Sequence, residues 1–269
     1  MTNKYAHPWQ VSMFKDEAKV NARVVKMVEG YKPYFEIASL LPLYNRLIGL
    51  LQNGPQAEHA CGGTVISSSY VFTAAHCVVK QFPSSMQELQ NLLQAAGITI
   101  PPNIQNLKLA NLFNIIYQPE EIFLVIGAKD IQESARSRLN DPNFFSRENI
   151  HQVIDIKMHP EYSLGLMPGF GMGVQEHGYD NDFAILTLKK KLTFSKTGPV
   201  AACLPKMQSN QQWSDYTGEE AVTSGWGMND RAMTSGMQDK LKEVYVKIWS
   251  NQDCTRAWSG RPVNNCCTG

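Results

Sequence analysis

The sequence has almost no net charge, and it lacks the long apolar runs and short motifs that identify several protein classes. Its 25 Lys and Arg residues balance 24 Asp and Glu residues, for a formal net charge of +1. This balance argues against a nucleic-acid binder that works by bulk electrostatic attraction. No uncharged apolar run reaches the roughly 18 residues that a membrane span needs. No Asn-X-Ser/Thr sequon occurs either, so glycosylation gives no information about the compartment.

The cysteines also lack a familiar arrangement, since no Cys-X-X-Cys pair occurs, and this argues against a zinc cluster. Six cysteines allow 15 complete pairings, among which the sequence alone cannot choose. Composition leaves two interpretations open: free thiols in a cytosolic enzyme, or a disulfide framework in an oxidising compartment. Met1 is followed by no apolar signal-peptide core. The cysteines stand at positions 61, 77, 203, 254, 266 and 267.

The patterning of the 269 residues changes from mixed to mainly β near residue 120, and 43% hydrophobic residues suffice for a packed core. Apolar residues at helical spacing predict helices over 16–29, 35–52, 85–96 and, more weakly, 103–116. Alternating or β-branched runs predict strands, with two short runs around a serine turn in 61–77. The other predicted strands lie in 7–13, 122–130, 150–159, 182–188, 221–227 and 241–249.

The segment CGGTVISSSYVFTAAHC (61–77) resembles the region around the catalytic histidine of the chymotrypsin/trypsin family of serine proteases. Other segments resemble that family in the order in which its members carry them. They are HPWQVSM (7–13), LVIGAKD (124–130), HPEY (159–162), DNDFAILTL (180–188), ACLP (202–205), TSGWG (223–227) and CCTG (266–269).

The resemblance implies that His76 is a general base and that Asp182 orients it. A histidine base needs a neutral ring, and a carboxylate fixes its tautomer and stabilises the imidazolium that forms. Asp182 precedes the apolar run Phe183–Leu186, where a carboxylate needs hydrogen-bond partners. The alternatives are a core histidine bonded to a backbone carbonyl, a turn carboxylate at 182, and Asp180 as the orienting residue. The remaining histidines are expected at surface or turn positions without metal-ligand spacing: His7, His59, His151, His159 and His177.

The resemblance implies an all-β fold of two antiparallel six-stranded barrels, with the active cleft between them and the second barrel incomplete. We expect the first barrel in residues 1–200 and a partial second barrel in 201–269. Helical insertions are expected at about 14–58, 80–118 and 163–178. They are interpreted as a cap that restricts substrates or docks a partner. For 14–58 the alternative is sequence foreign to the family, such as non-coding sequence read through in translation.

The family nucleophile lies in a Gly-Asp-Ser-Gly-Gly loop that follows a segment like CCTG, and this motif occurs nowhere in residues 1–269. The Ile/Val-Val-Gly-Gly start of active family members is also absent. We therefore expect a serine-type endopeptidase by resemblance, acting on polypeptides, whose chain as written is inactive because it lacks the nucleophile. The alternative is a non-catalytic protease homologue that binds a protein inhibitor or docking partner through its insertions.

The resemblance further implies a secreted protein with disulfide bonds, no metal and no cofactor. The implied pairs are Cys61 with Cys77 and Cys254 with Cys267, with Cys266 as an alternative partner in the second pair. Related chains often pair the counterpart of Cys203 with a cysteine in a pro-segment or near the far C-terminus. No such partner is evident in this sequence, so Cys203 is expected to be free.

Overall fold

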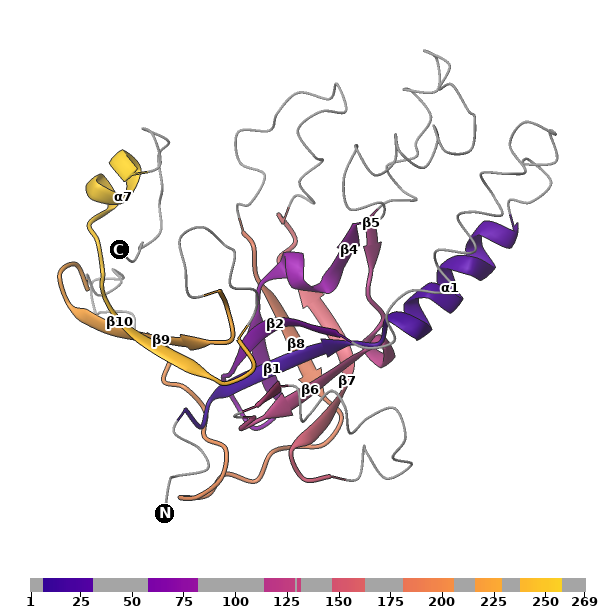
Figure 1. Cartoon of the computed structure of the whole chain (residues 1–269), viewed down its shortest axis with the longest axis horizontal. Coiled ribbons are helices and arrows are strands. Elements are labelled where there is room, and N and C mark those ends of the chain that lie inside the picture. The colour runs from indigo at the N-terminus through magenta and orange to yellow at the C-terminus, as the bar shows by residue number, and fades with distance from the viewer. Residues whose placement is uncertain are drawn as a thin grey trace, which may run out of the picture.

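A closed barrel of six antiparallel strands forms the centre of the molecule (Figure 1). The computed structural model describes residues 7–30, 58–81, 114–128, 130–131, 147–162, 181–205, 216–228 and 238–257. Around the barrel the strands follow the order β1-β2-β3-β8-β7-β6. Their bounds are β1 Gln10–Lys15, β2 Glu58–Val65, β3 Tyr70–Thr73, β6 Ile122–Ile126, β7 Ile150–Met158 and β8 Ala184–Leu188. All six lie in or beside segments that the sequence predicts as β.

The barrel strands form because their side chains suit a closed, two-faced sheet. In β8 the buried residues alternate with partly exposed ones, as expected where one face meets the core. In β6 every residue is buried, since the sequence Ile-Phe-Leu-Val-Ile contacts the barrel interior on one face and a second cluster on the other. Closure leaves no unpaired strand edge.

The β2–β3 hairpin matches the predicted pair of β runs around a serine turn. Ser67 Oγ accepts hydrogen bonds from the backbone N–H groups of Ser69 (3.1 Å) and Tyr70 (3.0 Å), which closes the turn. Gly63 permits the close approach of the two strands. A Cβ atom there would lie 3.0 Å from Val71 Cγ1 and 3.1 Å from the Phe72 carbonyl oxygen. This hairpin leads directly to His76.

Helix α1 (Glu17–Gly30) confirms the helix predicted over 16–29, and it leaves the barrel at the end of β1 (Figure 1). Asp16 Oδ1 accepts the Lys19 N–H at 3.3 Å, and Val20 is fully buried in the barrel core. Arg23 forms a two-point ion pair with the buried Glu121, at 2.7 and 2.8 Å. These contacts fix the first turns of the helix to the barrel.

The predicted helix over 103–116 is wrong at its described end. Residues Asn114–Ile116 form strand β5, which pairs antiparallel with β4 (Val79–Gln81). Two adjacent β-branched residues, Ile115 and Ile116, favour a strand, and a short apolar run does not distinguish helix from strand by its spacing. The predicted helices over 35–52 and 85–96, and the insertion 163–178, lie outside the described residues.

A separate two-stranded sheet follows the barrel, formed by β9 (Glu220–Gly225) and β10 (Lys242–Lys247), with helix α7 (Asn251–Ala257) after it. Residues 216–228 and 238–257 show this sheet and no second barrel. The sheet is joined to the first barrel through Trp226, which is 2% exposed and packs with Phe14 and Phe123. None of the helices in the described part of the chain combines the length and apolar character that crossing a membrane requires.

Candidate active site

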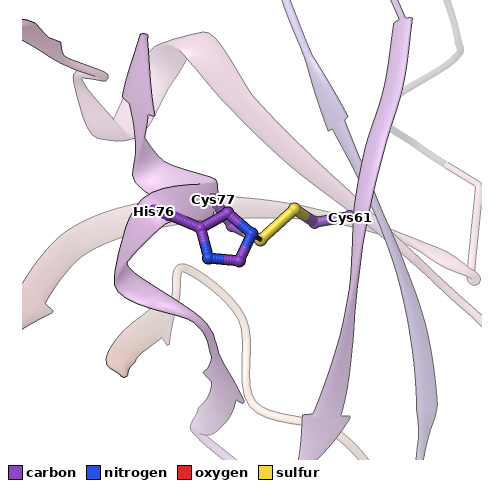
Figure 2. A group of neighbouring side chains, drawn as sticks. All are labelled: Cys61, His76 and Cys77. Atoms are coloured by element: carbon purple, nitrogen blue, oxygen red, sulfur yellow. Dashed lines mark hydrogen bonds between the residues drawn. A yellow bond between two sulfur atoms is a disulfide. The ribbon is translucent and has the colours of Figure 1, made fainter. Parts of the chain in front are cut away.

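His76 lies on the short 3-10 helix η1 (Ala75–Val78), which follows strand β3 directly. Ala75, Cys77 and Val78 are buried, whereas the His76 side chain is 56% exposed. The small side chain of Ala75 is fully buried and lets this turn pack closely on the barrel core. A disulfide joins Cys77 to Cys61 on β2, so the turn that carries His76 is covalently tied to the neighbouring strand (Figure 2). The histidine is therefore held by its backbone while its ring stays accessible.

Asp182 contacts His76 at two points, although 106 residues separate them in sequence. The His76 backbone N–H donates to Asp182 Oδ1 at 2.8 Å, and the ring Nδ1 lies 2.6 Å from Oδ2. Because an ionised carboxylate only accepts hydrogen bonds, Nδ1 carries the proton in this contact. In the neutral ring, this contact selects the tautomer with its proton on Nδ1 and its lone pair on Nε2.

The chain around Asp182 is shaped to present its carboxylate. Asn181, just before it, has φ of 58°, a left-handed conformation that asparagine tolerates better than most residues. Phe183, just after it, stacks on Phe72 of β3, with ring centroids 5.8 Å apart. The Phe183 carbonyl accepts the His159 N–H at 3.0 Å. The residues on both sides of Asp182 are thus fixed by local geometry, and no pattern in the sequence singled out Asn181 or Phe72.

The arrangement can move a proton. Nε2 of His76 is the ring nitrogen left free by the carboxylate, and the exposed ring allows a reacting group to approach it. The Asp182 side chain is 21% exposed, so its carboxylate is partly shielded from water. A histidine oriented in this way has the geometry to accept a proton at Nε2 and to return it later.

Cys61, His76 and Cys77 form the only group of three metal-ligating side chains found among the described residues, with their ligand atoms within 4.8 Å of one another (Figure 2). Both sulfurs are committed to the disulfide. A disulfide sulfur carries no thiolate charge, and zinc is bound by the thiolate form of cysteine. In the disulfide form, this group therefore offers a metal ion only the imidazole.

His59 differs from the expectation of a surface or turn histidine. It lies on β2, with Nδ1 2.7 Å from Ser12 Oγ and its ring edge against both Phe14 and Trp226. Burial lowers the pKa of His59 from 6.5 to about 4. No local signal reveals this position, because the contacting residues come from β1 and from the segment after β9.

His151 also lies on a strand, β7, where burial, together with the charge of Lys190, lowers its pKa. His159 lies at the turn after β7, as predicted, and its Nδ1 accepts the Glu161 N–H at 3.2 Å. His7 pairs with Glu243 at 2.6 Å. His177 and Asp180 lie outside the described residues.

The remaining cysteines are placed as follows. Cys254 on α7 is fully buried and disulfide-bonded, while the predicted partner Cys267 and the alternative Cys266 lie outside the described residues. Cys203 is a free, exposed thiol. The structure thus brings together His76, Asp182, Cys61 and Cys77 in one place, and Cys254 belongs to a separate region.

Comparisons with known proteins match most of the chain. A family model described as Trypsin matches residues 45–120 and 125–269. Tissue-type plasminogen activator of Mus musculus is 24% identical over 210 residues, which are 76% of this chain and 26% of that protein. The clotting factor G beta subunit of Tachypleus tridentatus is 22% identical over 219 residues, covering 81% of this chain and 50% of the relative.

A third relative, trypsin Tyr p 3.0101 of Tyrophagus putrescentiae, is 24% identical over 203 residues, covering 76% of this chain and 48% of the relative. The chain thus spans half or less of the length of these curated relatives.

Proposed function

The chain belongs to the trypsin family of serine proteases, and from this membership we propose that it is a serine-type endopeptidase chain with His76 as general base. In this proposal Asp182 orients the base, and the substrates are polypeptides. The observation that carries the assignment is the double contact of Asp182 with the ring and the backbone N–H of His76. That contact gives Nδ1 the proton and leaves Nε2 to accept one.

The proposed reaction is acyl transfer to water. His76 Nε2 takes the proton of a serine hydroxyl as its oxygen attacks the peptide carbonyl carbon. The C–N bond then breaks, and the same nitrogen gives the proton to the leaving amine. A water molecule repeats the sequence on the acyl-enzyme and releases the acid. Asp182 stays ionised throughout and stabilises the imidazolium.

The nucleophile is the remaining requirement. Residues 1–269 contain no Gly-Asp-Ser-Gly-Gly motif. We therefore assign to this polypeptide the base and its orienting carboxylate, but not the serine or the oxyanion hole that belongs to the same loop. A fluorophosphonate probe, which labels activated serines, is expected to leave the folded 269-residue polypeptide unlabelled. Labelling of any serine would contradict this part of the proposal.

The roles of His76 and Asp182 are tested separately, by nitrogen NMR of the histidine rings. The His76 signal should report a proton on Nδ1 that is hydrogen-bonded to a carboxylate. The Asp182→Asn substitution should shift the ring toward the other tautomer, because an amide can also donate. Asp155→Asn is the control. The Asp155 carboxylate lies at the surface, 3.7 Å from Lys157 Nζ, so its loss should leave the His76 signal unchanged. An unchanged tautomer in Asp182→Asn would overturn the assignment.

A non-catalytic protease homologue is the second candidate, and the anchoring of α1 favours it. The helix is anchored by its own Val20, which is buried in the barrel core, and by the ion pair of its Arg23 with the buried Glu121, so it is a built part of the protein that could dock a partner. The full transcript distinguishes the two candidates. A serine at the nucleophile position supports the enzyme, and glycine or another residue there supports the homologue.

The proposed compartment is extracellular. The Cys61–Cys77 disulfide and the disulfide-bonded Cys254 support it, because disulfides persist in oxidising compartments.

A further inference from the structure

We propose that reduction of the Cys61–Cys77 disulfide converts the His76 region into a binding site for one zinc-class divalent cation. The ligands are the two thiolates and the His76 Nε2 atom. The three ligand atoms already lie within 4.8 Å of one another (Figure 2). Two cysteines and one histidine match the ligand types of catalytic zinc sites, which keep a fourth position open.

The distances suit tetrahedral coordination. Zinc bonds of about 2.3 Å to sulfur and 2.0–2.1 Å to nitrogen imply a sulfur-to-nitrogen separation of about 3.5 Å at the tetrahedral angle. Cys77 Sγ lies 3.5 Å from His76 Nε2. The two sulfurs must separate to about 3.8 Å once the bond between them is cleaved.

Asp182 supplies the outer contact that such a site requires. A histidine that binds zinc commonly donates its other ring N–H to a carboxylate, which fixes the tautomer and raises the basicity of the ligating nitrogen. His76 Nδ1 makes this contact with Asp182 Oδ2 at 2.6 Å. The metal-binding nitrogen is therefore the one that Asp182 leaves free.

The surroundings allow a cation to enter. The His76 side chain is 56% exposed and Cys61 is partly exposed, while Cys77 is 4% exposed. Cys77 is thus held in the core, Cys61 is partly buried against it, and the His76 ring is the most exposed of the three ligands. A water molecule can take the fourth position on the solvent side.

The redox step balances with a dithiol as the reductant. The dithiol gives two electrons to the sulfur–sulfur bond and becomes a disulfide itself, and two cysteine thiols form. When the cation binds, the two thiols release two protons and coordinate as thiolates. Binding also occupies the lone pair of Nε2. If the proposed function holds, the cation therefore blocks the general base, whereas the binding itself does not depend on that function.

Cobalt(II) is the probe for the test, because tetrahedral cobalt with thiolate ligands absorbs visible light. The full chain is reduced with a trialkylphosphine, which takes oxygen from water and becomes the phosphine oxide, and is then titrated with Co²⁺. We expect tetrahedral absorption that Zn²⁺ displaces. The Cys61→Ser/Cys77→Ser double variant, reduced in the same way, should lose this site. The difference isolates it from metal held by the other four cysteines.

Single substitutions keep the test independent of folding defects in the double variant. His76→Ala changes an exposed side chain and should weaken cobalt binding at the site at least about 10-fold. Asp182→Asn should weaken it about 10-fold through the outer contact. His7→Ala and Cys203→Ser, which lie outside the site, should leave cobalt binding at the site unchanged. Far-UV circular dichroism confirms that each variant is folded.

Two outcomes would overturn the proposal: no cobalt bound by the reduced chain, or binding that is unaffected by His76→Ala. Neither outcome bears on the tautomer test of the proposed function, so the two proposals fail separately.

Discussion

The barrel and the β9–β10 sheet are both antiparallel, yet they bury their residues very differently. All five residues of β6 are buried, whereas in β10 only Val246 is even partly buried. Val244 is 52% exposed and Tyr245 is 63% exposed. A closed barrel has an inside and no free edges, while two strands alone enclose nothing. Antiparallel pairing therefore contributes little stability here unless closure or a covering layer removes side chains from water.

This difference explains where the site residues lie. His76 follows β3 and Asp182 precedes β8, and these two strands pair directly in the barrel. The positions of both residues depend on the barrel and on none of the hydrogen bonds within the β9–β10 sheet. The β9–β10 sheet depends in turn on the barrel, because Trp226, which follows β9, is buried against barrel residues.

The largest effect is expected from matched aromatic truncations in the two regions. Phe123→Ala removes a ring that is 2% exposed and stacked on Phe14, and should lower the free energy of unfolding by about 3–5 kcal/mol. Tyr245→Ala, at 63% exposure, should change it by no more than about 0.5 kcal/mol. Urea unfolding followed by circular dichroism measures both. Equal losses would show that the sheet carries as much stability as the barrel.

Trp226 tests how firmly the sheet is joined to the barrel. Trp226→Ala should cost about 3 kcal/mol by opening a cavity in the cluster that contains Phe14 and Phe123. Within the described structure, the indole Nε1–H is buried without a hydrogen-bond partner. Trp226→Phe keeps most of the packing and removes that polar group, so its cost should be about 1 kcal/mol or less. Denaturant melts of both variants give the comparison, and a larger loss in Trp226→Phe than in Trp226→Ala would contradict it.

The smallest effect is a pH dependence of the free energy of unfolding. It arises at the contact between the barrel and the β9–β10 sheet, called here the junction, where His59 lies against Trp226. The pKa of His59 is about 4 when folded and 6.5 as the ordinary value, so the unfolded chain takes up a proton first as the pH falls. The contribution of the neutral His59 ring to the free energy of unfolding is complete above pH 6.5 and is lost as the pH falls from 6.5 to about 4. The loss should be about 1–2 kcal/mol, because the ring is partly exposed.

The His59→Gln substitution should reduce this dependence, as measured by urea unfolding at pH 7 and pH 4.5. His151→Gln is the matched comparison, since the pKa of His151 is shifted in the same direction. A pH dependence that is unchanged in His59→Gln would show that His59 does not report on the junction.

The strands were predictable because period-two alternation and β-branched residues are local signals. Helix α1 was predictable for the same kind of reason, as its apolar residues keep helical spacing up to Gly30. Strand β5 was not, because three residues with two isoleucines fit a helix or a strand, and only their pairing with Val79–Gln81 decides. Individual strands and helix α1 were thus accessible from local patterns, and the exceptions depend on distant partners. The two-barrel fold class came from the family resemblance, and the described residues show one closed barrel.

The site was accessible in part. His76 and Asp182 were predicted from resemblance, but their double contact depends on barrel closure, which no spacing in the sequence encodes. His59 was misplaced at the surface because its neighbours are Ser12, 47 residues away, and the distant Trp226. Burial that arises between distant segments leaves no local pattern to recognise.

The β4–β5 hairpin has a consequence for how this protein tolerates change in length. Its paired strands, Val79–Gln81 and Asn114–Ile116, bring Gln81 and Asn114 side by side shortly after η1. Doubling the length of a flexible segment between fixed ends costs only about 0.6 kcal/mol in closure entropy. Additions or deletions between Gln81 and Asn114 are therefore expected to leave His76 in place. The β4–β5 pair is therefore a suitable place to graft a foreign domain.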